Sequence, residues 1–496
     1  MYVHDLVHQG RPGDIAVIDH DRRMTYEELA QAVRACRDRL YSVGVRQGDR
    51  VGIFSRNCAE YIYAYLGIVS LGAIAVPINF QLSSRETAYI LKDAGIEHLL
   101  TSQTLHLVDA LAAMRSSLQV TQHDLRGCGT PKPGIKPAPP LGEFFSVDNP
   151  CVIIYTSGTT GSPKGAVLSH RNLVTNVKQI GTRLHMEAYH RSLCVLPMYH
   201  CFGWTCSVLY PLYVGASIVI LDSFTPKETI ATIRDEGVTD ACIVPSICSL
   251  LTKLASKEDM KTLRLVVSGG TALPQKIEQD FRDKFDAPIC EGYGLSEASP
   301  VVTMNPCDNT RAGSIGPIVP DIDWRIISGD GSQVPLGETG ELIIRGGNVM
   351  LGYWNLEEAT KETLRGGWLH TGDIVRADAD GYIYIVDRIK DMIISMGENI
   401  YPREVEELIY QFPGISEVAV IGIEDKLRGQ AGACFYSVNK GVKLNVRELK
   451  KFLQANLALF KIPREFHEVD KLPRTSTGKI AKRVILKDFY GDKKIK

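Results

Sequence analysis

Residues 151–173, CVIIYTSGTTGSPKGAVLSHRNL, join an apolar strand to a loop rich in glycine, hydroxyl side chains and lysine. Glycines allow backbone N–H groups to turn toward a bound anion, and hydroxyl and ammonium groups add further donors. The segment therefore predicts a loop that wraps phosphate oxygens. The loop residues that could contact phosphate are Thr156, Ser157, Gly158, Thr159, Thr160, Gly161 and Lys164.

This loop differs from the phosphate-binding loop of mononucleotide-binding proteins. The pattern GxxxxGK followed by Ser or Thr, counted from Gly158, requires glycine at 163 and a hydroxyl residue at 165, where the chain has Pro163 and Gly165. A flexible surface linker is the alternative, but linkers seldom continue directly from a strand of buried type. We therefore expect an anion-binding loop of another kind.

The elements that must position this loop alternate between strands and helices. A helix opens with Thr25 and a glutamate three residues later, which is a capping box, and the apolar strand RVGIFS follows it. A second helix, YIYAYLGIVSLGA, precedes the strand AVPIN, and the alternation resumes between residues 190 and 300. Apolar strands separated by helices predict an α/β fold with mostly parallel sheets covered by helices.

Changes in the pattern of predicted strands, helices and turns along the chain predict its domains. The chain has 496 residues, which is more than a domain with a single hydrophobic core usually contains. Short strands and tight turns between 311 and 389, with the hairpin cue Asp380-Gly381, predict a β-rich subdomain. We therefore expect a large N-terminal domain, residues 1–389, followed by a small mobile α+β domain, residues 390–496.

Charge and composition narrow the class of protein. Lys and Arg number 56 against 57 Asp and Glu, so nothing favours binding to nucleic acid or acidic membranes. Residues 390–496 carry 14 Lys and 6 Arg against 14 acids, a surplus of six positive charges, which leaves a charge of −7 on residues 1–389. Two such parts could close over an anion. The start of the chain lacks a leader pattern and no segment has the apolar length of a membrane span, so we expect a cytoplasmic protein.

The loop YTSGTTGSPKG resembles the signature loop of the acyl-adenylate-forming enzymes, the superfamily of acyl-CoA synthetases, peptide-synthetase adenylation domains and luciferases. Seven further blocks follow in the order typical of that superfamily, so the resemblance extends over nearly the whole chain. The blocks are PMYHCFGW (197–204), SGGTALP (268–274), EGYGLSEASP (291–300), GWLHTGD (367–373), VDRIKD (386–391), SMGENIYPREVE (395–406) and PRTSTGK (473–479).

The resemblance implies a reaction with ATP, Mg²⁺ and CoA. A carboxylic acid is activated to acyl-AMP with release of pyrophosphate, and the acyl group then passes to a thiol. The loop would hold the β- and γ-phosphates, and Thr156 and Glu297 would bind magnesium through hard oxygen ligands. Asp373 would accept from the ribose hydroxyls, with Arg388 beside it. The other residues implied in ATP or AMP binding are Gly269, Gly270, Thr271, Glu291, Gly292, Tyr293, Gly294, Ser296 and Ile385.

The same resemblance implies catalytic and conformational roles. Lys479, in any other context an ordinary surface lysine, would bridge the substrate carboxylate and the α-phosphate during adenylation. Lys390 would be the hinge about which the C-terminal domain turns between the two half-reactions. His200 would border the acyl site on the path of the thiol. After the turn, Gly397, Glu398 and Asn399 would face the active site and border a tunnel for CoA.

The expected substrate is an acid without an α-amino group, because the block around His200 offers no carboxylate to pair with an ammonium. An apolar pocket would suit an aliphatic chain or an aromatic ring, and several blocks resemble bacterial medium- and long-chain fatty acyl-CoA synthetases. A fatty acid:CoA ligase is the main hypothesis. An aryl acid:CoA ligase, an acyl-AMP ligase that loads a carrier protein, and a non-catalytic nucleotide-binding protein stay open, as does the oligomeric state. The candidate acyl pocket comprises Phe202, Trp204, Val208, Val244 and Pro245.

Overall fold

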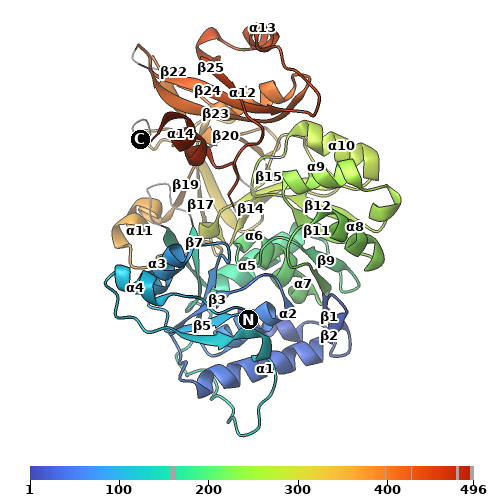
Figure 1. Cartoon of the computed structure of the whole chain (residues 1–496), viewed down its shortest axis with the longest axis vertical. Coiled ribbons are helices and arrows are strands. Elements are labelled where there is room, and N and C mark those ends of the chain that lie inside the picture. The colour runs from blue at the N-terminus through green and yellow to red at the C-terminus, as the bar shows by residue number, and fades with distance from the viewer. Residues whose placement is uncertain (157–162, 397, 426, 476–479, 492–496) are drawn as a thin grey trace.

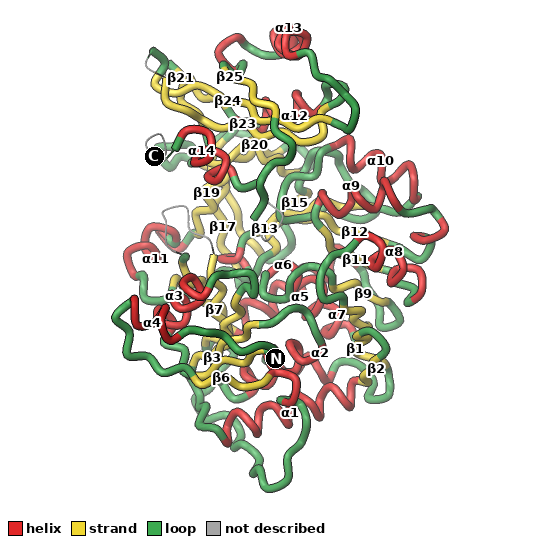
Figure 2. Tube along the Cα trace, in the orientation of Figure 1, coloured by secondary structure: helices red, strands yellow, loops and turns green. Residues whose placement is uncertain are grey.

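The computed structural model describes residues 1–156, 163–396, 398–425, 427–475 and 480–491. Four β-sheets organise these residues, three in the large N-terminal part and one in the C-terminal part. Figures 1 and 2 show the C-terminal part at one end of the molecule, above the body formed by the other sheets. The predicted α/β architecture of a large domain followed by a small one is confirmed.

The first sheet carries the predicted phosphate loop between two of its strands. Its central strands are parallel, whereas β8 runs antiparallel to β7 and β18 antiparallel to β8. The strand order is β18 (Gly352–Tyr353), β8 (Lys164–Ser169), β7 (Pro150–Thr156), β4 (Ile74–Ile78), β3 (Arg50–Phe54), β5 (His98–Thr101) and β6 (Thr121–Asp124).

The second sheet is parallel except at its two edges, where β14 and β2 are antiparallel to their neighbours. Parallel strands need covering helices on their faces, which matches the alternation of elements in the sequence. The strand order is β14 (Val301–Met304), β13 (Ile289–Gly294), β12 (Leu265–Ser268), β11 (Asp240–Ile243), β9 (Arg191–Cys194), β10 (Ser217–Ile220), β1 (Ile15–Asp19) and β2 (Arg22–Thr25).

The third sheet is antiparallel throughout its described pairs and corresponds to the predicted β-rich segment. Asp380 and Gly381 turn the chain between β19 and β20, and Gly381 has a φ of 83°, which suits glycine. The strand order is β15 (Gly316–Pro317), β20 (Tyr382–Arg388), β19 (Leu369–Ala377), β17 (Gly340–Gly346) and β16 (Ile322–Ile327).

The C-terminal sheet has its own hydrophobic cores, separate from those of the body. The chain leaves β20 at Arg388 and enters this sheet at Ile393, so the predicted boundary at 389/390 falls in the connection. The order is β22 (Glu398–Ile400), β21 (Ile393–Ser395), β24 (Gly429–Val438) and β23 (Ile415–Asp425), and β25 (Glu465–Glu468) pairs with β24.

Helices cover the sheets, and α1 begins with the predicted capping box between Thr25 and Glu28. Within the described ranges, no helix combines the length and the apolar character needed to cross a membrane. The helices are α1 (Tyr26–Ser42), α2 (Ala59–Ser70), α3 (Ser84–Ala94), α4 (Val108–Ala113), α5 (His170–Leu184), α6 (Cys201–Trp204), α7 (Tyr210–Val214), α8 (Pro226–Asp235), α9 (Pro245–Leu254), α10 (Gln275–Phe285), α11 (Glu357–Thr363), α12 (Pro402–Tyr410), α13 (Val446–Asn456) and α14 (Lys482–Tyr490).

Candidate active site

A cavity of about 2440 Å³ lies where the three sheets of the body meet the C-terminal domain. Its lining comes from the carboxyl ends of β7 and β13, from β19, β20 and α9, and from α12, β23 and the start of α14. Ligands of open α/β sheets bind outside the carboxyl ends of the strands. The cavity is therefore the candidate active site.

The ends of the predicted phosphate loop lie on the wall of this cavity. Thr156 ends β7 and Lys164 begins β8, and the two residues are paired in the antiparallel ladder. The Lys164 ammonium lies 5.1 Å from the centroid of the Tyr353 ring. Five predicted phosphate ligands, Ser157, Gly158, Thr159, Thr160 and Gly161, lie outside the described residues.

Glu297, the predicted magnesium ligand, lies on the same wall as Thr156 and Lys164. The hydroxyl of Tyr353 donates to Glu297 Oε1 at 2.7 Å, and the backbone N–H of Met350 donates to the carbonyl of Glu297 at 2.8 Å. Tyr353 belongs to β18, which pairs with β8, so one tyrosine connects the loop strand to the acid. A carboxylate and a hydroxyl are oxygen donors of the kind that Mg²⁺ prefers, so these residues fit the ion.

Tyr293, Asp373 and Arg388 form a connected group that also lines the cavity. The Tyr293 hydroxyl donates to Asp373 Oδ2, and Arg388 Nε lies 2.8 Å from Asp373 Oδ1. The neighbouring carboxylate of Asp373 raises the pKa of Arg388, and burial together with Asp373 raises the pKa of Tyr293. Each oxygen of Asp373 has a second lone pair, so the carboxylate can still accept from a ribose.

The glycine-rich block after β12 lies partly on the cavity and partly against the core. Gly270, at a φ of 82°, and Thr271 line the cavity. At Gly269, however, a Cβ would lie 3.0 Å from the Phe202 ring, so this glycine allows Phe202 to pack against the backbone. Of the remaining predicted nucleotide-binding residues, those lining the cavity are Glu291, Gly292, Gly294, Ser296 and Ile385.

Glu291 is buried and has one hydrogen-bonded oxygen. Its Oε1 accepts from the backbone N–H of Leu273 at 3.0 Å, whereas Oε2 has no hydrogen-bond partner among the described residues. Burial raises the pKa of Glu291 to about 7, although the charge of Arg403 on α12 acts in the opposite direction. Arg403 comes from the C-terminal domain, so the two domains interact electrostatically at this point.

Only part of the predicted acyl pocket lines the cavity. His200 lines the cavity at the start of α6, where its Nδ1 accepts from the backbone N–H of Phe202 at 3.2 Å, and Pro245 lines it too. Trp204 packs in the core, with its ring centroid 4.3 Å from that of Tyr65. Phe202, Val208 and Val244 are likewise buried and lie outside the cavity lining.

The apolar part of the lining comes instead from residues that follow β9 and β10 of the second sheet and from α9. A helix has a single face toward a cavity, and for the helix that follows His200 the opposite face meets α2, which places Trp204 in the core. The helical spacing in VPSICSLLTKL was the signal that could have identified α9. The residues that sequence reasoning missed include Tyr199, Phe224, Ile247 and Leu250.

The C-terminal domain brings one of its two predicted functional segments to the cavity. Arg474, Thr475, Ile480, Ala481 and Lys482 line it, and they flank Lys479, which lies outside the described residues. Glu398 and Asn399 are exposed on β22 and do not line the cavity, and Gly397 is not among the described residues. Lys390 lines the cavity at the connection, where burial and then Arg388 lower its pKa.

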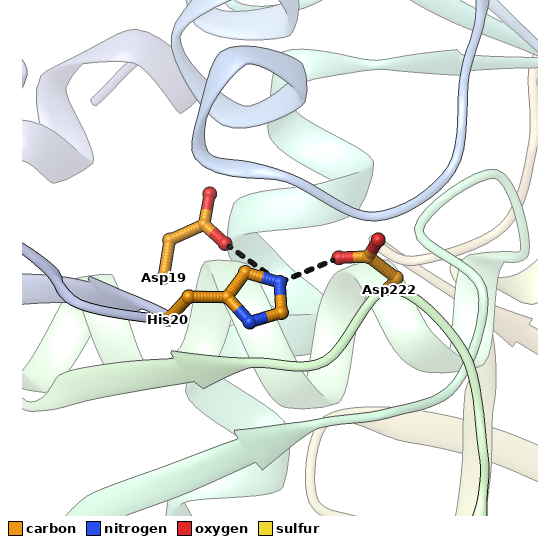
Figure 3. Close-up of side chains that lie close together, drawn as sticks. All are labelled: Asp19, His20 and Asp222. Atoms are coloured by element: carbon orange, nitrogen blue, oxygen red, sulfur yellow. Dashed lines mark hydrogen bonds and ion pairs between the residues drawn. The ribbon is translucent and has the colours of Figure 1, made fainter.

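A second group of titratable residues, Asp19, His20 and Asp222, is not part of this lining. Figure 3 shows the three side chains close together. His20 Nε2 lies 3.0 Å from Asp222 Oδ1 and 3.9 Å from Asp19 Oδ1. Its hydrogen bond to Asp222 raises the pKa of His20. Asp19 Oδ2 also accepts from the backbone N–H of Ala59 at the start of α2, so the group connects β1 to a helix N-terminus.

Comparisons with known proteins agree with this fold. The family model described as "AMP-binding enzyme" matches residues 6–354, and the model "AMP-binding enzyme C-terminal domain" matches residues 404–479. The fold is that of an acyl-adenylate-forming enzyme. The chain belongs to the AMP-binding enzyme family, which confirms the resemblance seen in the sequence.

Individual relatives are similar over nearly the whole chain. A feruloyl-CoA synthase from Amycolatopsis sp is 35% identical, with 96% of each chain covered. A long-chain-fatty-acid–CoA ligase from Bacillus subtilis is 31% identical over 96% of this chain and 92% of its own. The crystal structure of ATP-bound MatB from Rhodopseudomonas palustris has a TM-score of 0.91, with 28% identity and 99% of each chain covered.

Proposed function

We propose that the protein is an ATP-dependent acid:CoA ligase. In the first half-reaction, a carboxylate oxygen of the substrate attacks the α-phosphorus of ATP and pyrophosphate leaves. In the second, the CoA thiol attacks the acyl carbon and AMP leaves. The observation that carries the proposal is one cavity lined by Thr156, Lys164 and Glu297, by Tyr293, Asp373 and Arg388, and by residues of the C-terminal domain.

The residues of the body divide the binding of ATP between them. Lys164 and the loop that begins at Thr156 would hold the β- and γ-phosphates, and Asp373 would orient the ribose. Mg²⁺, when held by Thr156 and Glu297, supplies positive charge that offsets the charge of the leaving pyrophosphate. Such a reaction needs positioned cations and donors more than a strong base, which matches the residue types of the wall.

The C-terminal domain would supply the residues that change between half-reactions. We assign to Lys479 the neutralisation of the carboxylate and α-phosphate during adenylation. Residues on both sides of it line the cavity in this structure, which supports an arrangement suited to the first half-reaction. Rotation about Lys390 would then withdraw this segment and bring Glu398 and Asn399 toward the cavity for the thiol step.

A fatty acid remains the proposed substrate. The apolar wall of Phe224, Pro245, Ile247 and Leu250 suits an aliphatic chain, and the Bacillus relative acts on long-chain fatty acids by name. A hydroxycinnamic acid is the second candidate, because the feruloyl-CoA synthase is 35% identical to this chain. Both candidates lack the α-ammonium that a free amino acid would bring to this wall.

A substrate panel tests the proposal. Pyrophosphate release and formation of the thioester, identified by mass spectrometry, would be followed with ATP, CoA and acids from octanoate to palmitate, together with ferulate. We expect acyl-CoA to form only when ATP, acid and CoA are all present. Turnover of ferulate but of no straight-chain acid would show that the substrate is a hydroxycinnamic acid and not a fatty acid. Absence of thioester with every acid would refute the ligase proposal.

A further inference from the structure

The part of the C-terminal domain on either side of Lys479, residues 472–475 and 480–482, borders the cavity. We call it the lysine segment, and two ion pairs attach it to the rest of the domain. On its N-terminal side, Arg474 contacts Glu417 Oε1, and the backbone N–H of Leu472 donates to Glu417 Oε2 at 3.3 Å. Glu417 belongs to β23, which pairs with β24 in the C-terminal sheet. This side of the segment is therefore attached to a strand by both oxygens of one carboxylate.

On the C-terminal side, the attachment is made by Lys482, the first residue of α14. Its Nζ donates to Glu406 Oε1 at 2.8 Å and to the carbonyl of Val420 at 3.1 Å. Glu406 Oε1 also accepts from the backbone N–H of Val420 at 2.7 Å, so the carboxylate of α12 is itself oriented by β23. Lys482 thus contacts a helix and a strand of the domain at the same time.

The two sides of the segment are also joined to each other. The backbone N–H of Ala481 donates to the carbonyl of Pro473 at 2.8 Å, and Arg474 and Ile480 form an isolated antiparallel bridge. A displacement of Lys482 would therefore move both ends of the segment rather than one. Arg474, Ile480 and Lys482 all line the cavity, so the displacement would change its border.

Lys482 also interacts with the connection between the domains. Burial lowers the pKa of Lys482, but the charges of Glu406, Asp391 and Asp387 outweigh it and leave the pKa raised, so the side chain keeps its positive charge. Asp387 lies at the end of β20, and its Oδ2 accepts from the backbone N–H of Arg403 at 3.0 Å. The Lys482 side chain is 27% exposed and that of Glu406 is 18% exposed, so solvent screens this pair only in part.

We propose that Lys482, paired with Glu406, is a positioning residue for the adenylation half-reaction. It holds residues 472–475 and 480–482, on the two sides of Lys479, in place beside the cavity, and the pair of Arg474 with Glu417 assists it. The inference rests on the proposed function, in which Lys479 acts from within this segment. Lys482 itself acts through the backbone that it fixes and through the charges at the connection.

The test uses the full-length Lys482→Met variant, because methionine keeps the length of the side chain and removes its charge. Adenylation is measured by acid-dependent exchange of pyrophosphate into ATP, and the second half-reaction by thioester formation from supplied acyl-AMP and CoA. We expect kcat for adenylation to fall about 100-fold, the order of loss known for small misplacements of reacting groups. Thioester formation should be unchanged, because the segment serves only the first half-reaction.

Two further variants separate positioning from general effects of substitution. Lys482→Arg keeps the charge and the donors, so it should recover most of the adenylation rate. Lys487→Met removes an exposed lysine of the same helix, outside the cavity lining, and should leave both half-reactions unchanged. Thermal unfolding of each variant is measured in parallel.

A Lys479→Ala variant distinguishes failure of this inference from failure of the proposed function. If Lys479→Ala abolishes adenylation while Lys482→Met leaves it intact, the positioning role is wrong and the proposed function stands. If Lys479→Ala has no effect on adenylation, the role assigned to Lys479 and the positioning role of Lys482 both fall, whereas the ligase activity itself falls only if no acid is converted. An equal loss of both half-reactions in Lys482→Met, with a lower melting temperature and no recovery in Lys482→Arg, would show a purely structural role and overturn the inference.

Discussion

Replacing Asp373 by asparagine removes one negative charge from the part of the cavity that we propose binds the nucleotide, while keeping the shape of the side chain. The Asp373 side chain is 3% exposed and that of its partner Arg388 is 42% exposed. In the variant, the amide can still accept from the Tyr293 hydroxyl, but Arg388 loses its counter-charge. Both protein stability and nucleotide binding should therefore weaken, each for a separate reason.

The two magnitudes follow from the exposure of the pair. Breaking a fully buried ion pair costs about 3 to 5 kcal/mol and losing a surface pair costs about 0 to 1 kcal/mol, so a pair with one buried partner should cost about 2 kcal/mol of unfolding free energy. A hydrogen bond to a charged group contributes about 1.5 to 3 kcal/mol, so loss of the carboxylate should weaken AMP binding by about 2 kcal/mol, or about 30-fold.

Calorimetric titration with AMP and urea unfolding measure these two effects on the same preparation. Tyr293→Phe is the matched control, because it removes only the hydroxyl that donates to Asp373 and should weaken AMP binding by about 1 kcal/mol. An AMP affinity of Asp373→Asn equal to that of the parent protein would refute the assignment of Asp373 to nucleotide binding, whatever the change in stability.

Three further substitutions have expected outcomes. Tyr353→Phe removes the donor to Glu297, so half-maximal adenylation should need about 10-fold more Mg²⁺, and a titration curve identical to that of the parent would contradict this. The pKa of Glu291 is raised to about 7, so its protonation stabilises the fold at low pH, and this contribution, on the order of 3 kcal/mol, is lost as pH rises from about 4.5 to 7. Urea unfolding of Glu291→Gln should show a flatter pH dependence than the parent, and parallel profiles would exclude the effect. Gly294→Ala places a Cβ 2.0 Å from the carbonyl oxygen of Pro300 and should cost about 1 to 3 kcal/mol, and an unchanged melting temperature would show that the turn relaxes freely.

Much of the architecture could be predicted because local patterns carry it. The capping box at Thr25, the hairpin turn at Gly381 and the alternation of apolar strands with helices each depend on residues close together in the chain. The structure confirms all three. The membership in the AMP-binding enzyme family was likewise readable from the ordered motifs, and the comparisons confirm it.

The acyl wall could not be predicted in the same way. His200 and Pro245 line the cavity as expected, whereas Trp204 and Val208 pack in the core. A sequence shows that a helix is apolar, but the faces that meet a neighbour or a cavity depend on how the helix is packed against α2 and the sheet. A helix that is apolar on all its faces therefore gives no indication of which face lines the cavity.

The sequence alone determined the family, and its residue types and motif order predict a phosphate-binding loop, an acid and a mobile basic segment. The tertiary structure decided which of these groups share one cavity. Tyr353 reaches Glu297 and the strand of Lys164 because β18 pairs with β8, and Lys482 meets Glu406 because α14 packs against α12 and β23. Glu297 and Tyr353 are 56 positions apart in the chain, and Glu406 and Lys482 are 76 positions apart. Such contacts depend on the packing of whole elements rather than on any local pattern.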